Sequence, residues 1–144
     1  PIAAVKNNPR MHIPVFGNGD VDSPESAQEM RDRYGLDGAM IGRASIGNPW
    51  FFSQVKHYFK TGTHMDQPSL SDRVAVAKRH LEMSIAWKGE VLGVLETRRH
   101  YTNYFKGIQN FKPYRTAMVT ANDPQEVFDT FDRVLNEVVE PIWV

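Results

Sequence analysis

Short apolar runs and glycine-rich turns alternate near the start of the chain, and they predict a strand, a helix and a second strand. The first run is Ile13–Phe16, with a proline at its second position, and the second is Gly38–Ile41. Between them, residues 23–25 (Ser-Pro-Glu) are typical of a helix start, and Gly35 is typical of a helix end. This spacing favours a parallel β-α-β unit.

Helices are predicted on both sides of this unit. Ile2–Lys6 resembles the tail of a helix, and residues 47–60 combine five aromatic side chains with a helical pattern. The polar stretch 61–69 contains glycine and proline and predicts a boundary. We therefore expect two domains, residues 1–62 and 63–144.

The pattern after this boundary is helical throughout. Four helices are expected at about 69–89, 90–106, 113–121 and 123–138, with short connections typical of a small antiparallel bundle. The expected core positions are Val74, Ala77, Leu81, Ile85, Val91, Val94, Tyr101, Phe105, Val127, Phe131, Val134 and Val138. The predicted fold class is an α/β segment followed by an all-α bundle, dominated by helices overall.

Composition narrows the possible functions. The 144 residues include 17 basic and 17 acidic ones, so net charge gives no general argument for nucleic-acid binding. The chain has no cysteine, which excludes disulfides and thiolate chemistry within it. It also has no signal-like or membrane-length apolar run, which predicts a cytoplasmic protein without membrane contact. Because the chain starts without methionine, we expect a fragment of a longer protein.

Two glycine loops, each directly after a predicted strand, are the strongest candidates for chemistry. They read "GNGD" and "IGR", and glycine in such a loop lets the backbone N–H groups approach a phosphate closely. Either loop alone is explained by turn geometry, but two loops on consecutive parallel strands favour a phosphate-bearing ligand. The second loop also supplies Arg43, a fixed cation suited to phosphate oxygens.

Several of these side chains also have a structural interpretation. An acid beside a phosphate is unfavourable, so Asp20 is expected to orient the loop, whereas Arg43 is suited to phosphate oxygens. The aromatic residues 50–52 are expected to pack in the core rather than to stack on a base. The histidines lack the spacing of metal ligands, so no metal site is expected.

A cluster of basic residues lies in the second predicted bundle helix and beyond it. Arg99 and Lys106 share one helix face, whereas Arg98 falls on the apolar stripe and must either snorkel or pair. A charged helix face is usually only solvated, so RNA contact stays one of two interpretations. The candidate RNA-binding residues are Arg98, Arg99, His100, Lys106 and Arg115.

"IPVFGNGDVDSPESAQEM" followed by "GLDGAMIGRASIGNPWFF" closely resembles the C-terminal part of tRNA-dihydrouridine synthases, and "RRHYTNYFKG" resembles a helix of the same family. The resemblance implies the last two β-α units of a (β/α)8 (TIM) barrel, with Ile13–Phe16 and Gly38–Ile41 as strands seven and eight, followed by a helical domain that binds tRNA. It also implies FMN as cofactor and NADPH as reductant. The residues that the resemblance assigns to cofactor binding are Asn18, Gly19, Asp20, Gly42 and Arg43.

The same resemblance limits what this chain does alone. The family protonates uracil C5 with a cysteine that this chain lacks, so no catalytic residue is expected here, and the chain alone is expected to be inactive. FMN is expected to bind weakly or not at all, and the exposed strand edges are expected to favour self-association. Two other functions stay open: a fragment of another FMN-dependent TIM-barrel oxidoreductase, or a stand-alone helical RNA-binding module.

Overall fold

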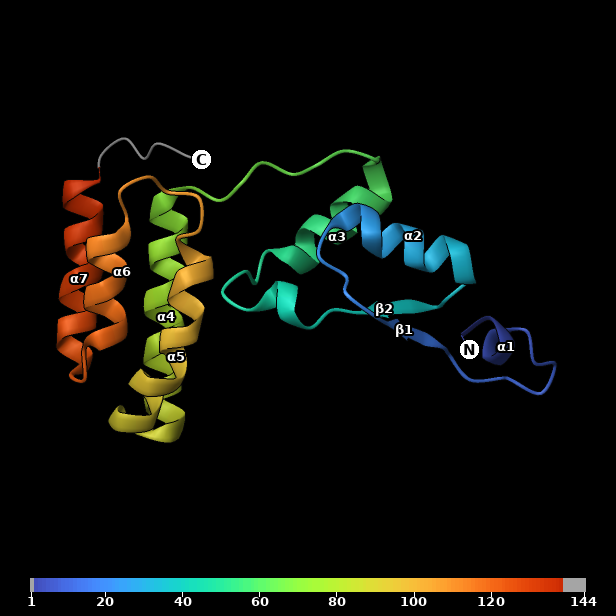
Figure 1. Cartoon of the computed structure of the whole chain (residues 1–144), viewed down its shortest axis with the longest axis horizontal. Coiled ribbons are helices and arrows are strands. Elements are labelled where there is room, and N and C mark those ends of the chain that lie inside the picture. The colour runs from blue at the N-terminus through green and yellow to red at the C-terminus, as the bar shows by residue number, and fades with distance from the viewer. Residues whose placement is uncertain (1, 139–144) are drawn as a thin grey trace. The chain divides into compact units, whose positions relative to one another are not determined.

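The computed structural model describes residues 2–138, and the chain divides into two compact units at Asp66 and Gln67 (Figure 1). We call them the sheet unit (described residues 2–66) and the helical unit (described residues 67–138). The sheet unit contains α1 (Ile2–Lys6), β1 (Phe16–Asn18), α2 (Pro24–Tyr34), β2 (Gly38–Met40), the 3-10 helix η1 (Arg43–Ser45) and α3 (Phe51–Thr61). The helical unit contains α4 (Leu70–Lys88), α5 (Glu90–Tyr104), α6 (Lys112–Thr120) and α7 (Pro124–Glu137).

The predicted parallel β-α-β unit is confirmed. β1 and β2 pair in parallel, and α2 connects them. The Ser23 side chain accepts a hydrogen bond from the backbone N–H of Ser26, and the Ser26 hydroxyl accepts one from the backbone N–H of Ser23, which together form a capping box. Gly35 ends α2 in the left-handed conformation, with φ at 59°.

The first strand lies further along the chain than the sequence predicts. It covers Phe16–Asn18 rather than Ile13–Phe16, because Pro14 has no amide hydrogen to donate to a ladder. Pairing begins at Val15, whose carbonyl accepts from the Asp37 N–H at 3.0 Å. The Val15 N–H donates to the Asp37 carboxylate at 2.8 Å. Half of the "GNGD" sequence is therefore strand.

The core of the sheet unit lies between α2, α3 and the two loops that follow the strands. Val21, Ala27, Phe51 and Val55 are buried there. Phe51 is thus core, as predicted, but Phe52 is 46% exposed, so the expectation of core packing is wrong there, because the next helix position points to another side. Phe51 also begins α3, whereas the sequence predicted a helix from residue 47. The helix starts later because residues 43–50 form η1 and turns.

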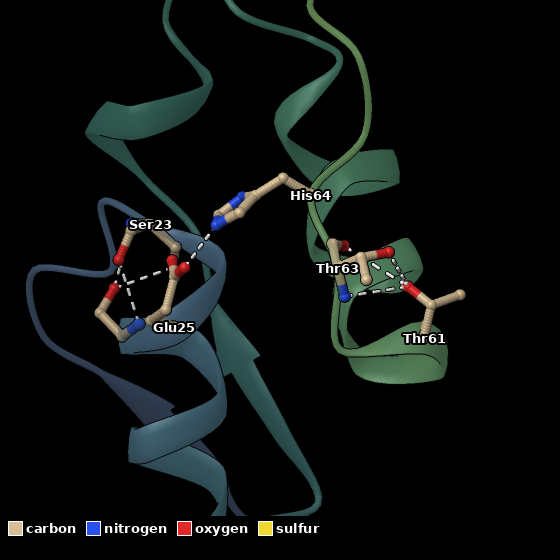
Figure 2. A network of polar contacts seen from close by, with 6 residues as sticks. Ser23, Glu25, Thr61, Thr63 and His64 are labelled. Carbon is tan, nitrogen blue, oxygen red and sulfur yellow. Dashed lines mark hydrogen bonds and ion pairs between the residues drawn. The ribbon is translucent and has the colours of Figure 1, made fainter.

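The segment after α3 folds back onto α2. Gly62 ends α3 with φ at 71°, and the hydroxyls of Thr61 and Thr63 form a hydrogen bond with their oxygens 2.9 Å apart. His64 then places Nε2 2.6 Å from Oε1 of Glu25, in the first turn of α2 (Figure 2). These contacts fix the direction in which the chain leaves α3.

The predicted four-helix arrangement of the helical unit is also confirmed. The packed pairs are α4 with α5, α5 with α6, α6 with α7, and α7 with α4 (Figure 1). Ser69 and Asp72 form the expected capping box at the start of α4, and Asp123 caps α7. The fully buried side chains include Val74, Leu81, Val94, Tyr101, Phe105, Met118, Val127, Phe131 and Val134.

The predicted core position at Val91 is wrong, because its side chain is 70% exposed. At 100° per residue it is rotated away from the stripe formed by Val94 and Tyr101. It also lies near the turn between α4 and α5, which extends beyond the ends of α6 and α7 (Figure 1). Within residues 2–138, neither α6 nor α7 reaches that level (Figure 1).

Candidate functional site

The loops after β1 and β2 begin at the same edge of the sheet. The strands are parallel and in register, with Phe16 opposite Gly38 and Asn18 opposite Met40. Their carboxyl ends therefore meet at one edge, where parallel α/β folds bind ligands. Asn18, predicted as a loop residue, is the last residue of β1 and is exposed.

Arg43 and Asp20 form an ion pair that joins the two loops. Nη2 of Arg43 donates to Oδ1 of Asp20, across 23 positions of sequence. Their side chains are 84% and 82% exposed, so both charges lie at the surface. The structure thus brings together one predicted ligand residue from each loop.

The glycines beside this ion pair leave space next to the backbone. A Cβ on Gly42 would meet no atom within 4 Å, and a Cβ on Gly19 would lie 3.7 Å from the Met30 methyl group. A ligand can therefore approach both backbone segments. Backbone N–H groups and a guanidinium are the usual hydrogen-bond donors to phosphate. These residues therefore fit the phosphate group of a cofactor.

Buried side chains hold both loops in place. Val21 follows Asp20 directly and is 5% exposed. Ile41 and Ala44 flank the Gly42–Arg43 pair in the second loop, and they pack against the same buried cluster as Val21. One core therefore fixes the separation of the two loops.

In the helical unit, Arg98 is used to cap α6. Its Nη2 donates to the Ala121 carbonyl at 2.5 Å and to Oδ1 of Asn122 at 2.8 Å. The sequence predicted that Arg98 must snorkel or pair, and the structure confirms that it pairs. The guanidinium satisfies the C-terminal end of a neighbouring helix, which leaves it less able to reach outward.

Arg99 and His100 belong to a small cluster between α4 and α5. Nε of Arg99 donates to Nε2 of His100 at 3.3 Å. The rings of His80 and His100 are 4.5 Å apart, and Nδ1 of His80 lies 3.1 Å from the Tyr104 hydroxyl. Burial, together with His80 and Arg99, lowers the pKa of His100 to about 4. Burial and then Arg99 also lower the pKa of His80.

These lowered pKa values predict that the helical unit loses stability in acid. The folded unit keeps both histidines neutral, whereas the unfolded chain binds protons near pH 6.5, so stability falls as the pH drops from about 6.5 towards 4. Because both rings are only half-buried, we expect a loss of about 1–2 kcal/mol. Urea unfolding at pH 7 and pH 5 measures it. His100→Gln should reduce the difference, and an unchanged difference would contradict the prediction.

The remaining predicted RNA-binding residues differ in exposure. Lys106 is exposed, and Arg115 is half-buried. Nε of Arg115 is buried, and it has no hydrogen-bond partner within residues 2–138. Of the five predicted residues, Arg99 and Lys106 are therefore the exposed ones.

Arg73 is a structural residue that the sequence reasoning missed. It is 9% exposed, its Nη1 donates to the Tyr104 carbonyl, and its Nε donates to the Pro68 carbonyl, both at 3.1 Å. Arg73 lies four residues before the buried Ala77, and residues with this spacing share one helix face. The spacing could therefore have identified Arg73 as a buried position. It connects the start of α4 to the end of α5.

The part of the chain that the structure describes, residues 2–138, shows neither a metal-binding cluster nor a membrane-spanning helix. It holds no group of three or more His, Asp or Glu side chains placed to bind a metal ion. None of its helices is long and apolar enough to cross a bilayer.

The family model for dihydrouridine synthase (Dus) matches residues 1–139. This match includes both loops, β1, β2, η1 and helices α1 to α7. The chain belongs to the dihydrouridine synthase family. The motifs that suggested the family therefore lie within one continuous match.

Curated proteins of this family are similar over most of the chain. A probable tRNA-dihydrouridine synthase of Rickettsia conorii is 34% identical over 139 residues, which cover 96% of this chain and 41% of that protein. tRNA-dihydrouridine synthase B of Pseudomonas putida is 37% identical over 124 residues, which cover 86% of this chain and 36% of that protein. The chain therefore spans about two fifths of the length of these relatives.

Proposed function

We propose that this chain forms the C-terminal part of a flavin-dependent tRNA-dihydrouridine synthase, an enzyme that reduces uridine to dihydrouridine in tRNA. The observation that carries the proposal is the ion pair between Arg43 and Asp20, which brings the two motif loops together at the carboxyl edge of a parallel sheet. The names of the similar Rickettsia and Pseudomonas proteins support the same reaction.

Each unit has a separate part in this proposal. Residues 1–62 would be the last two β-α units of a (β/α)8 barrel, and residues 63–144 would be a tRNA-binding helical domain. The parallel, consecutive strands support the first assignment. Ile13 and Phe16 are 71% and 66% exposed, as expected for side chains that further barrel strands would cover.

The residues of the two loops would anchor the cofactor. Arg43 would pair with the phosphate of FMN, and the backbone at Gly19 and Gly42 would donate to its oxygens. Asn18 would add a side-chain amide at the end of β1, and Asp20 would orient its own loop. FMN, reduced by NADPH, would supply the hydride for uracil. We place the enzyme in the cytoplasm, with tRNA as its substrate.

This chain would position the cofactor without moving a proton. Reduction of uracil needs a general acid at C5, and the family resemblance assigns that role to a cysteine. The chain contains no cysteine, so the acid would come from another part of a longer protein. The isolated chain is therefore expected to be inactive.

Dihydrouridine formation tests this proposal. The longer protein that carries this chain is mixed with NADPH and with tRNA that lacks dihydrouridine, and the tRNA is digested and analysed by mass spectrometry. We expect a gain of two mass units at specific uridines. NADPH oxidation with unmodified tRNA would instead support another FMN-dependent oxidoreductase acting on a small molecule. Binding of tRNA without any NADPH oxidation would favour a stand-alone RNA-binding module.

Exchange of Arg99 and Lys106 for alanine is expected to weaken tRNA binding by the chain about threefold to tenfold. Both residues are exposed, and each cation that contacts a phosphate releases counterions. The slope of log affinity against log salt concentration should therefore fall by about 1–2. Filter binding at several salt concentrations measures both quantities.

Lys88→Ala is the matched control for these exchanges. Lys88 also lies on a helix of the bundle, but it pairs with Glu96. Its removal should change tRNA affinity little. Equal losses in the control and in the Arg99 and Lys106 variants would mean that total charge, rather than this face, determines binding.

A further inference from the structure

Asp20 lies in a backbone conformation that is unusual for its residue type. Its φ is 36°, and Asn110 is the other non-glycine residue with positive φ in the described part of the chain. Aspartate and asparagine tolerate this left-handed region better than most residues do. Val21 is buried immediately after Asp20, so the core holds the chain in place on that side. The carboxylate is thus presented to the second loop by a fixed backbone.

The first loop contains two acids, and they have different partners. Asp22 accepts a hydrogen bond at 3.3 Å from the Ser26 hydroxyl, near the start of α2. Asp20 pairs across the loops with Arg43. Of these two acids, Asp20 is the one paired with a cation that could bind a phosphate. A phosphate that approaches Arg43 would therefore be repelled by the charge of Asp20.

This pair is well suited to exchange. Both side chains are more than four-fifths exposed, and ion pairs at that exposure contribute little to stability. A tethered carboxylate nevertheless acts at a high effective concentration, so it outcompetes dilute monoanions in solution. A phosphomonoester carries more charge and can accept two parallel hydrogen bonds from the guanidinium. It can therefore replace a single carboxylate contact.

We propose that Asp20 is the internal counter-ion of Arg43, which the phosphate of the cofactor displaces, and that it sets the affinity of the two loops for phosphomonoesters. This inference rests on the proposed function, because FMN supplies the phosphate there. Before the cofactor binds, Asp20 is paired with the Arg43 guanidinium. Its negative charge also weakens the binding of other anions to the loops. It is a specificity-determining residue and takes no part in hydride or proton transfer.

The test is a titration of the chain with FMN and with riboflavin, which lacks the phosphate, up to millimolar concentrations. Amide resonances of Gly19 and Gly42 report binding. Asp20→Asn removes the charge and keeps a residue that tolerates positive φ. We expect it to bind FMN about twofold to fivefold more tightly, with riboflavin unchanged. Asp22→Asn removes the same charge from the same loop and should have a smaller effect.

Two outcomes would overturn the proposal in different ways. If Arg43→Gln weakens FMN binding while Asp20→Asn leaves it equal or weaker, Asp20 is no competitor, and the phosphate site itself stands. If FMN binds no better than riboflavin in every variant, or if neither binds, the loops hold no phosphate. The assignment of Asp20 and the proposed role of the loops then both fail.

Discussion

Replacing Arg73 with alanine is expected to lower the free energy of unfolding of the helical unit by about 2–3 kcal/mol. The guanidinium is buried, and it donates to the Pro68 and Tyr104 carbonyls. Alanine leaves both acceptors without this donor and removes the packing of a long side chain. Arg73 lies in the first turns of α4, where a cation is unfavourable, but that effect recovers only a few tenths of a kcal/mol.

Native-state hydrogen exchange measures this loss within the helical unit alone. The most protected amides of α4 and α5 should exchange faster by the factor that corresponds to 2–3 kcal/mol, about 30-fold to 150-fold. Arg79→Ala, at an exposed position of the same helix, should change stability by less than about 0.5 kcal/mol. Similar effects of the two exchanges would mean that the contacts of Arg73 contribute nothing specific.

Gly93→Ala is expected to destabilise the same unit by about 1–2 kcal/mol net, although alanine is the better helix former. A Cβ on Gly93 would lie 2.7 Å from Cα of Ile85 and 2.8 Å from its backbone nitrogen. Backbone atoms, unlike a side chain, cannot relieve such a contact by changing rotamer. The helices α4 and α5 must therefore move apart. The gain in helix propensity, about 1 kcal/mol, offsets only part of that cost.

Native-state hydrogen exchange of the most protected amides of α4 and α5 measures the effect of this exchange. Thr102→Ala, at an exposed position of α5, is the control and should change stability by less than about 0.5 kcal/mol. A Gly93→Ala variant that is more stable than the wild type would show that the two helices have room for a methyl group.

Local sequence signals predicted the ends of the helices well. Ser23 caps α2, Gly35 ends it, Ser69 caps α4 and Asp123 caps α7, each as expected. These signals work because a capping contact joins residues two to four positions apart. The tertiary fold has little freedom to override them.

Contacts between distant residues could not be predicted in the same way. The glycine loops predicted that Asp20 and Arg43 share a site, but their direct pairing depends on strand register and on the common core under both loops. The cluster of His80, His100 and Tyr104 depends on how α4 and α5 cross. The start of β1 at Phe16 depends on its pairing with β2, which begins 22 residues later at Gly38.

Basic residues in one cluster also turned out to have different surroundings. Arg98 and Arg99 are neighbours in sequence, yet Arg98 caps α6, whereas Arg99 is exposed and donates to His100. A rotation of 100° per residue separates them on the helix. The density of positive charge in a sequence therefore overstates the charge that one surface presents.

The phosphate site that we propose for the two loops is tested most directly by the FMN requirement of the full-length enzyme that we propose contains this chain. Dihydrouridine formation in tRNA is measured against FMN concentration for the wild type and for Arg43→Gln. We predict that the variant needs about 10-fold to 100-fold more FMN for half of its maximal rate and reaches a similar rate at saturation. An unchanged FMN requirement would contradict the assignment of Arg43 and of both loops.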